Sequence, residues 1–284
     1  MQKSGRRLCI YQGLGEKMAE KWEKGSVPLS GSEMEYVAFG AGNRTLVVLP
    51  ALSYRPVRGV GAVLARKYQL IGQNRRVVFL DAREHLPKQV TVSQLAEDAA
   101  EGMRKLGIAR ADVLGISLGG MIAQYLAINH PEQVGKLVLA VTLSRSNAAI
   151  MEAAQKWADA AAAGDYESVA RDMLVNVYSP VFAARYAKAF PLTARLEPLR
   201  DPEQFIRLAR ACLTCDTFDA LPSLRCPTLV IGGRQDRIVT GEASVELAGR
   251  IGAELYMYED LGHSVFDEGT DFVRRVNDFL RENE

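Results

Sequence analysis

Residues 111–120 read A-D-V-L-G-I-S-L-G-G and continue into M-I-A-Q-Y-L-A-I-N-H at residues 121–130. The first half is a continuous apolar run typical of a buried strand, and the second half has helical periodicity. Between them lies the pattern G-x-S-x-G, with Ser117 at its centre. A sharp turn between a strand and a helix exposes a serine hydroxyl at the edge of a sheet. Gly115 and Gly119 suit such a turn because side chains there would clash where strand and helix pass closely.

The context of this pattern decides how much it indicates. G-x-S-x-G by itself occurs by chance in about one in ten chains of this size, given ordinary residue frequencies. Its place between a buried strand and a helix favours a nucleophile elbow, and the helix would also direct its free N–H groups toward the reacting centre. The alternative interpretation is a glycine-rich turn that carries an inert serine.

The same strand signal recurs along the chain, separated by segments with helical periodicity. Continuous β-branched and apolar runs are typical of parallel strands that are buried on both faces. Their alternation with helices predicts an α/β fold, with a mostly parallel, doubly wound sheet covered by helices on both faces. Strands are expected at residues 33–38, 45–49, 77–80, 111–115, 136–141, 228–232 and 254–258, and helices at 59–68, 93–106, 118–129, 241–250 and 270–281.

One stretch interrupts the alternation. Residues 144–221 contain only helical patterns, broken by several prolines, and they predict an inserted all-helical cap. The α/β core is then expected to comprise residues 32–143 and 222–284. Residues 1–31 carry clustered charge and are expected to form an N-terminal extension, with a short exposed helix at residues 14–24.

A serine nucleophile needs a base, and the chain contains three histidines. His263 follows the last expected strand, and parallel strands bring their carboxyl ends to one edge of the sheet. His130 is expected at the far end of the helix that follows Ser117, and His85 is the weaker candidate on the correct edge. Asp236 follows the strand at residues 228–232 and is expected to orient the base. The predicted catalytic residues are therefore Ser117, Asp236 and His263.

At this point the chain resembles the α/β-hydrolase fold superfamily, specifically its capped members with a Ser-Asp-His triad, which include esterases and lipases. The resemblance covers roughly residues 32–284. It rests on G-I-S-L-G-G-M-I-A-Q, H-P-E-Q-V-G-K-L-V-L-A, P-T-L-V-I-G-G-R-Q-D and a final G-H-S. These motifs together are specific for the fold and the triad, and they say little about the substrate.

The resemblance also implies an oxyanion hole built from the backbone N–H groups of Leu52 and Leu118. Members of the superfamily usually have His-Gly before this loop, whereas this chain has Pro50-Ala51. A backbone donor does not depend on side-chain identity, so the hole can persist with altered geometry. A second departure is D-A-R-E-H at residues 81–85, where relatives often read D-x-R-G-x-G.

Composition and charge exclude several other classes of protein. Lys and Arg number 35 and Asp and Glu 34, a net charge of +1 that offers no general attraction for nucleic acid or an anionic membrane surface. Neither a signal-peptide core nor a membrane-spanning apolar run is present in the sequence, so a cytoplasmic protein is expected.

Cys212 and Cys215 form C-x-x-C, for which packing is favoured over a zinc or redox site. No metal or organic cofactor is implied.

The leading hypothesis is a serine hydrolase that cleaves a small carboxylic ester or related acyl compound through an acyl-enzyme. Hydrolysis of carbon–carbon bonds, lactones or thioesters by the same triad is the first alternative, and a non-catalytic binding protein of this fold is the second. Tyr178, Phe182 and Tyr186 of the cap are candidates for an acyl pocket, although packing of the cap is the simpler role for each. Arg207 and Arg210 lie three residues apart and can either hold a substrate carboxylate or face solvent.

Overall fold

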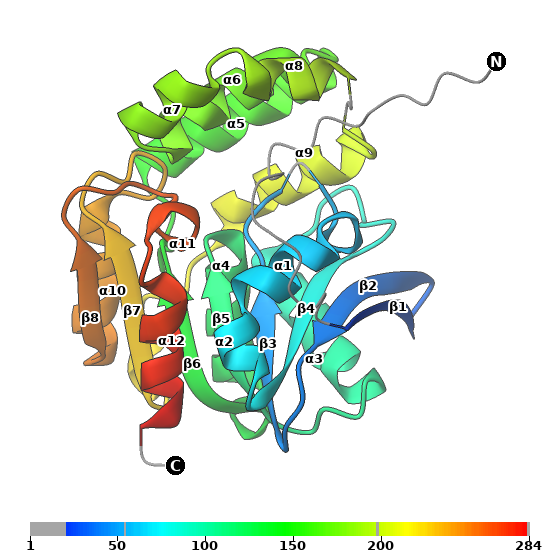
Figure 1. Ribbon diagram of the computed structural model, residues 1–284, viewed down its shortest axis with the longest axis vertical. Coiled ribbons are helices and arrows are strands. Elements are labelled where there is room, and N and C mark those ends of the chain that lie inside the picture. The colour runs from blue at the N-terminus through cyan, green and yellow to red at the C-terminus, as the bar shows by residue number, and fades with distance from the viewer. Residues whose placement is uncertain (1–20, 54, 197–198, 283–284) are drawn as a thin grey trace.

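A single sheet organises the protein, whose computed structural model describes residues 21–53, 55–196 and 199–282. Within these residues, eight strands pair in the order β1-β2-β4-β3-β5-β6-β7-β8 (Figure 1). The pairs from β4 to β8 are parallel, whereas β1–β2 and β2–β4 are antiparallel. The α/β class predicted from the sequence is confirmed. The strands are β1 (Trp22–Leu29), β2 (Ser32–Phe39), β3 (Arg44–Leu49), β4 (Arg75–Arg83), β5 (Ala111–Ile116), β6 (Val134–Ala140), β7 (Thr228–Gly233) and β8 (Glu254–Tyr258).

Both faces of the sheet are buried beneath helices. Alternate residues of each central strand point to opposite sides of the sheet and so enter different apolar clusters. In β3, Leu46 and Val48 belong to one apolar cluster and Val47 and Leu49 to the other. Helices α1, α2 and α12 cover the first face, and α3, α4 and α10 cover the second. These helices are α1 (Gly61–Lys67), α2 (Gln69–Gly72), α3 (Val92–Lys105), α4 (Leu118–Asn129), α10 (Gly241–Ile251) and α12 (Phe272–Arg281).

The N-terminal boundary of the core differs from the sequence prediction. Strand β1 lies within the segment expected to be an extension, so residues 22–31 belong to the sheet. Only Val27 and Leu29 of this edge strand are buried, while its other side chains are charged, small or exposed. The apolar alternation was therefore too weak to reveal the strand. Residues 22–24 of the expected helix are also part of β1, and its remaining residues before position 21 lie outside the described ranges.

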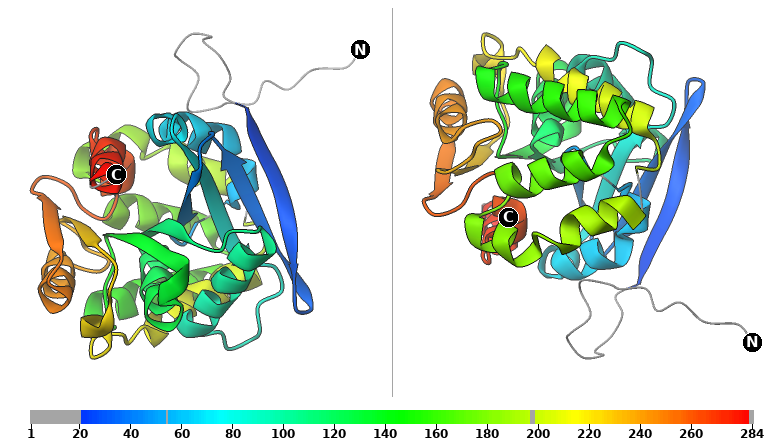
Figure 2. Two further views of the ribbon diagram at one scale, coloured as in Figure 1. Left: turned by 90° about the horizontal axis from the view of Figure 1, so that it is seen from below. Right: turned by 90° about the horizontal axis from the view of Figure 1, so that it is seen from above.

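The stretch between β6 and β7 is helical, as expected, and forms a lid above the carboxyl ends of the strands (Figures 1 and 2). The last of its α-helices, α9, ends at Ala211, and a turn of 3₁₀-helix follows. The lid helices are α5 (Ala148–Ala162), α6 (Tyr166–Val177), α7 (Pro180–Tyr186), α8 (Ala189–Leu196) and α9 (Pro202–Ala211).

Cys212 and Cys215 are buried beneath this lid. Their thiols donate to the carbonyls of Leu208 and Leu143, each at 3.5 Å, and burial raises the pKa of Cys212 to about 12. A buried, protonated thiol is a packing group with little nucleophilic character. In the described part of the chain, no three His, Cys, Asp or Glu side chains are grouped as metal ligands. Nor is any helix there long and apolar enough to cross a bilayer.

The amino end of helix α4 approaches the backbone of the sheet closely. A Cβ atom added to Gly119 would lie 1.9 Å from the carbonyl oxygen of Leu49, at the end of β3. A Cβ atom on Gly115 would lie 2.5 Å from the carbonyl oxygen of Gly119. The two glycines therefore allow the amino end of α4 to contact β3 and β5 directly.

This close approach predicts opposite effects for two Gly→Ala substitutions. Gly119→Ala should destabilise the protein by about 2 kcal/mol or more, because the added methyl group meets backbone that cannot move aside cheaply. Gly249→Ala is the matched control in α10, where an added Cβ meets nothing within 4 Å. It should stabilise by about 0.5–1 kcal/mol through helix propensity. Urea unfolding measures both, and equal effects would contradict the packing described.

Candidate active site

Ser117 occupies a strained turn between β5 and α4. Its φ of 53° and ψ of −116° lie in a region that residues other than glycine rarely adopt. The backbone N–H of Ser117 donates to the carbonyl of Ala140 at 2.9 Å, and Thr142 Oγ1 donates to the Ser117 carbonyl at 2.8 Å. These contacts with β6 and the residues after it hold the strained conformation. Although Ser117 is the N-cap residue of α4, its hydroxyl makes no capping hydrogen bond and is directed elsewhere.

The Ser117 hydroxyl meets the side chain of His263. The distance from Ser117 Oγ to His263 Nε2 is 2.9 Å, and that from His263 Nδ1 to Asp236 Oδ2 is 2.8 Å. A carboxylate only accepts hydrogen bonds, so Nδ1 carries the proton and Nε2 of the neutral ring accepts from the serine. Thus the structure brings together the three residues that the sequence placed after β5, β7 and β8.

The Asp236 carboxylate is fixed on both oxygens. Oδ1 accepts from the backbone N–H groups of Ile238 at 2.8 Å and Val239 at 3.0 Å, while Oδ2 binds the imidazole. Asp236 is 7% exposed and His263 is 4% exposed. Shielding from water strengthens the interaction between them and restricts the ring to one orientation.

The other two histidines lie where the sequence positions suggested. His130 ends α4, and its Nε2 is 2.8 Å from the Glu97 carboxylate at the protein surface. His85 lines the cavity described next, on the same edge of the sheet as Ser117.

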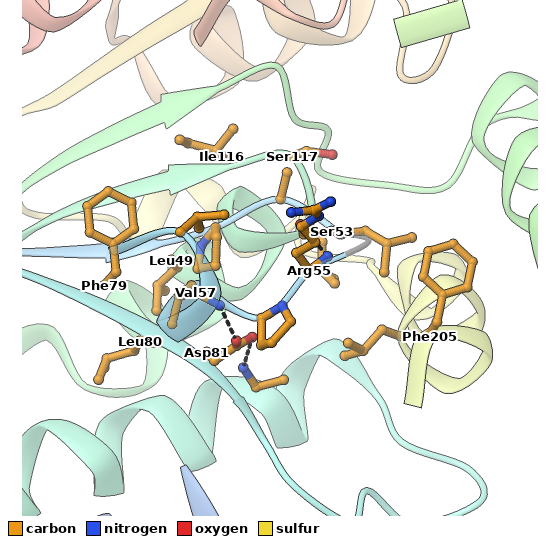
Figure 3. A pocket seen from close by; sticks show the side chains of 18 of the residues that line it. Leu49, Ser53, Arg55, Val57, Phe79, Leu80, Asp81, Ile116, Ser117 and Phe205 are labelled. Carbon is orange, nitrogen blue, oxygen red and sulfur yellow. Dashed lines mark hydrogen bonds between the residues drawn. The ribbon is translucent and has the colours of Figure 1, made fainter. Parts of the chain in front are cut away.

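Ser117 and His263 line a cavity of about 580 Å³ between the sheet and the lid. Figure 3 shows Phe79 of β4 and Phe205 of α9 on opposite sides of the space in front of Ser117. The volume is in the usual range for pockets that enclose small organic molecules. Its apolar lining includes Leu49, Leu52, Val57, Phe79, Ile116, Ile122, Trp157, Met173, Phe190 and Phe205.

The three aromatic candidates of the lid divide into two groups. Tyr178 lines the cavity, whereas Phe182 and Tyr186 are not among the described residues that do so. Phe182 stacks on Tyr178 with ring centroids 4.3 Å apart and contacts Tyr186 at 4.4 Å. The structure therefore does not place Phe182 and Tyr186 at the cavity, as the sequence analysis expected, because these two rings of α7 pack on one another and Phe182 stacks on Tyr178.

Arg207 was considered as a carboxylate ligand, and the structure gives it another role. Its guanidinium donates to the carbonyl of Leu86 and pairs with Glu203 one helical turn away. It thereby ties α9 to the loop that follows β4. Sequence reasoning missed Trp157 and Met173, which enter the cavity from α5 and α6. The helical spacing of apolar residues in these two segments showed only that each helix has one buried face.

Asp81, at the end of β4, secures the loop that follows β3. Its Oδ2 accepts from Val57 N at 2.9 Å and its Oδ1 from Ala82 N at 2.9 Å (Figure 3). Burial raises the pKa of Asp81 to about 6, and the nearby Glu35 charge acts in the same direction. The two backbone donors oppose this shift. Sequence analysis noted this segment only as a departure from the usual D-x-R-G-x-G pattern.

The two expected oxyanion donors belong to this same region. Leu52 and Leu118 both line the cavity beside Ser117. The contact of Gly119 with the Leu49 carbonyl brings the start of α4 against the end of β3, and Leu52 follows three residues later. Pro50 and Ala51 also line the cavity, and their side chains are not needed for a backbone donor.

The fold and this geometry can now be compared with known proteins. A family model described as the alpha/beta hydrolase fold matches residues 58–270. The chain belongs to the α/β-hydrolase fold family. The strained serine turn, the sheet order and the inserted lid of this α/β-hydrolase chain agree with that assignment.

Relatives within the family carry several hydrolase names. The 2-hydroxymuconate semialdehyde hydrolase of Pseudomonas putida is 33% identical over 235 residues, covering 74% of this chain and 78% of the relative. A Rhizobium rhizogenes protein named as a carbamate hydrolase, RutD, is 27% identical over 233 residues, covering 78% and 89%. The enol-lactonase structure from Burkholderia xenovorans LB400 has a TM-score of 0.79 at 24% identity and covers 91% of this α/β-hydrolase chain and 100% of that one.

Asp81 makes the stability of this α/β-hydrolase chain depend on pH in a defined window. A carboxyl whose pKa is raised from 3.8 to about 6 favours folding below pH 4, and this contribution is lost as pH rises toward 6. In Asp81→Asn, the amide that replaces the carboxyl group does not titrate in this pH range. The free energy of unfolding of the wild type relative to Asp81→Asn should therefore fall between pH 4 and pH 6, by at most about 3 kcal/mol.

Urea unfolding of both proteins at several pH values measures this difference. Asp219→Asn is the control, because it removes an exposed surface carboxylate, which pairs with Arg250 at 3.6 Å. A difference between wild type and Asp81→Asn that stays constant from pH 4 to pH 7 would show that Asp81 titrates normally.

Proposed function

We propose that this protein is a serine hydrolase that cleaves a small, uncharged carboxylic ester or a related acyl compound through an acyl-enzyme. The observation that supports this most is the hydrogen-bonded array of Ser117, His263 and Asp236 at the wall of a largely apolar cavity. Serine is weakly nucleophilic at its ordinary pKa, and an aligned neutral imidazole supplies the base it lacks.

The first half of the reaction transfers the acyl group to the protein. Ser117 Oγ attacks the substrate carbonyl carbon while its proton passes to His263 Nε2. Asp236 stabilises the resulting imidazolium through Nδ1. The backbone N–H groups of Leu52 and Leu118 bind the oxyanion of the tetrahedral intermediate. Collapse of that intermediate breaks the bond to the leaving group, which takes the proton from Nε2.

The second half returns the protein to its starting state. A water molecule gives a proton to His263 Nε2 as its oxygen attacks the acyl-enzyme carbonyl. The new tetrahedral intermediate collapses to release the carboxylic acid. Ser117 regains its proton from the imidazolium.

The cavity supports an uncharged substrate. Its lining is largely apolar, and six of the charged side chains at its wall lie in three pairs: Arg83 with Asp98 at 3.4 Å, Arg200 with Glu35 at 3.9 Å, and Lys67 with Asp267. A charged substrate would have to compete with these pairs and lose its own hydration on entry. An apolar acyl chain instead gains from burial against the aromatic and aliphatic wall.

Hydrolysis of a carbon–carbon bond is a second candidate. It is favoured by relatives whose names describe the hydrolysis of 2-hydroxy-6-oxo-dienoates or a muconate semialdehyde. Lactone hydrolysis is compatible with the same array, and a structural neighbour is an enol-lactonase. A non-catalytic binding protein would have little reason to keep three buried polar side chains aligned at hydrogen-bond distances.

Substitution of the nucleophile tests the proposal directly. Ser117→Ala should lower the hydrolysis of p-nitrophenyl esters by about 10⁴-fold or more and abolish labelling by a fluorophosphonate probe. Ser223→Ala removes a surface hydroxyl that bonds only to the Ala220 carbonyl in the described structure and should behave as wild type. Activity of Ser117→Ala near the wild-type rate would refute the proposed mechanism.

A substrate panel separates the candidates. Esters of graded acyl length, a lactone, a thioester, a carbamate and a 2-hydroxy-6-oxo-dienoate would be compared by kcat/KM. We expect the uncharged esters to give the highest values, because most of the cavity wall is apolar. A dienoate preferred by about 100-fold or more over every ester would instead identify a carbon–carbon bond hydrolase.

A further inference from the structure

The lid is joined to the loop of His263 by a compact polar junction. Residues 177–179 connect α6 to α7, and they run beside Ser264, the residue that follows the histidine. The backbone N–H of Ser264 donates to the carbonyl of Val177 at 3.0 Å. Ser264 is fully buried and begins the short helix α11 (Val265–Glu268). The two segments are thus in direct backbone contact.

Glu268 links the same two segments through its side chain. Its Oε2 accepts from the backbone N–H of Ser179 at 2.8 Å and from the hydroxyl of Ser264. Its Oε1 accepts from the hydroxyl of Ser179 at 2.6 Å. The single turn of α11 fixes the carboxylate in place, since the N–H of Glu268 donates to the Ser264 carbonyl at 2.9 Å. Hydrogen bonds to a charged acceptor are stronger than neutral ones.

Residues next to this junction in the sequence line the cavity. The hydroxyl of Tyr178 donates to Asp267 Oδ2 at 3.1 Å, and Lys67 pairs with the same carboxylate. Val177, Tyr178, Phe266 and Asp267 all line the cavity. The junction is therefore part of the wall that an acyl chain would contact, and its residue Ser264 directly follows the base, His263.

We propose that Glu268 is a positioning residue that fixes the His263 loop and the lid segment 177–179 relative to each other. One carboxylate bonds to the residue beside the histidine and to the residue that starts α7, so neither can shift independently of the other. In consequence, Glu268 sets the alignment of the base together with the width of the cavity at Val177 and Tyr178. This inference rests on the proposed serine hydrolase function.

Hydrogen exchange tests the junction without any activity measurement. In Glu268→Ala, the amides of Ser179 and Ser264 should exchange about tenfold faster or more, because the first loses its acceptor and the second its anchored neighbour. Glu268→Gln keeps one acceptor oxygen and should give an intermediate rate. Glu246→Ala is the matched control, since it removes an exposed carboxylate of α10 that pairs with Arg145. Equal exchange in Glu268→Ala and wild type would overturn the proposal.

Kinetics with a short and a long ester distinguish positioning from a general loss of structure. Glu268→Ala should raise KM for a p-nitrophenyl octanoate by about tenfold, leave KM for the acetate nearly unchanged, and lower kcat for both. A smaller folded fraction would lower kcat equally and leave both KM values unchanged. Glu268→Gln should recover part of the octanoate KM. An unchanged octanoate KM in Glu268→Ala would overturn the proposal.

A double-mutant cycle with Ser179→Ala completes the test. Because Ser179 and Glu268 belong to one junction, adding Ser179→Ala to Glu268→Ala should change the octanoate KM less than twofold further. If the two substitutions instead raise the octanoate KM by factors that multiply, Ser179 and Glu268 act independently, which would contradict the proposed junction. Failure of the proposed function is recognised separately: wild-type protein would then neither hydrolyse esters nor be labelled at Ser117, while the exchange experiment would still report on Glu268.

Discussion

The approach of the α4 backbone to the Leu49 carbonyl is the contact on which the site depends. Gly119 permits it, and the turn before it then has room only for the left-handed backbone of Ser117. The strain at that residue is held by hydrogen bonds from its N–H to Ala140 and from Thr142 to its carbonyl. The hydroxyl is thereby directed away from the helix and toward His263, and the helix N–H groups are directed toward the same space.

Parallel strands explain why distant segments meet there. The loops after β5, β7 and β8 leave the sheet at one edge, so Ser117, Asp236 and His263 approach one another although they are far apart in the sequence. The helices of the lid lie over this edge (Figure 1), and the cavity is lined by residues of both the lid and the sheet. Burial strengthens the polar array, since fewer water molecules compete for its hydrogen bonds. It also leaves the acyl group in contact with the lid and the sheet at once.

Three charged side chains around the cavity join segments that are far apart in the chain. Asp81 holds the loop after β3 through Val57, Arg207 holds α9 to the Leu86 carbonyl, and Glu268 holds the lid to the His263 loop. Each of these side chains bonds to backbone N–H or carbonyl groups that no regular strand or helix satisfies. The charged residues around the proposed substrate site therefore contribute mainly to its shape.

The sequence by itself determined the α/β class, the helical insertion and the three residues of the polar array. Buried strands are recognised from their composition, and the edge at which strands end is a property of every parallel sheet. It did not reveal β1, whose exposed edge lacks an apolar pattern, or the roles of Asp81 and Glu268. It also assigned Phe182 and Tyr186 to the cavity, where only Tyr178 lies. Periodicity identifies the buried face of a lid helix, but whether that face meets a neighbouring helix or the cavity is decided by the packing of helices far apart in the chain.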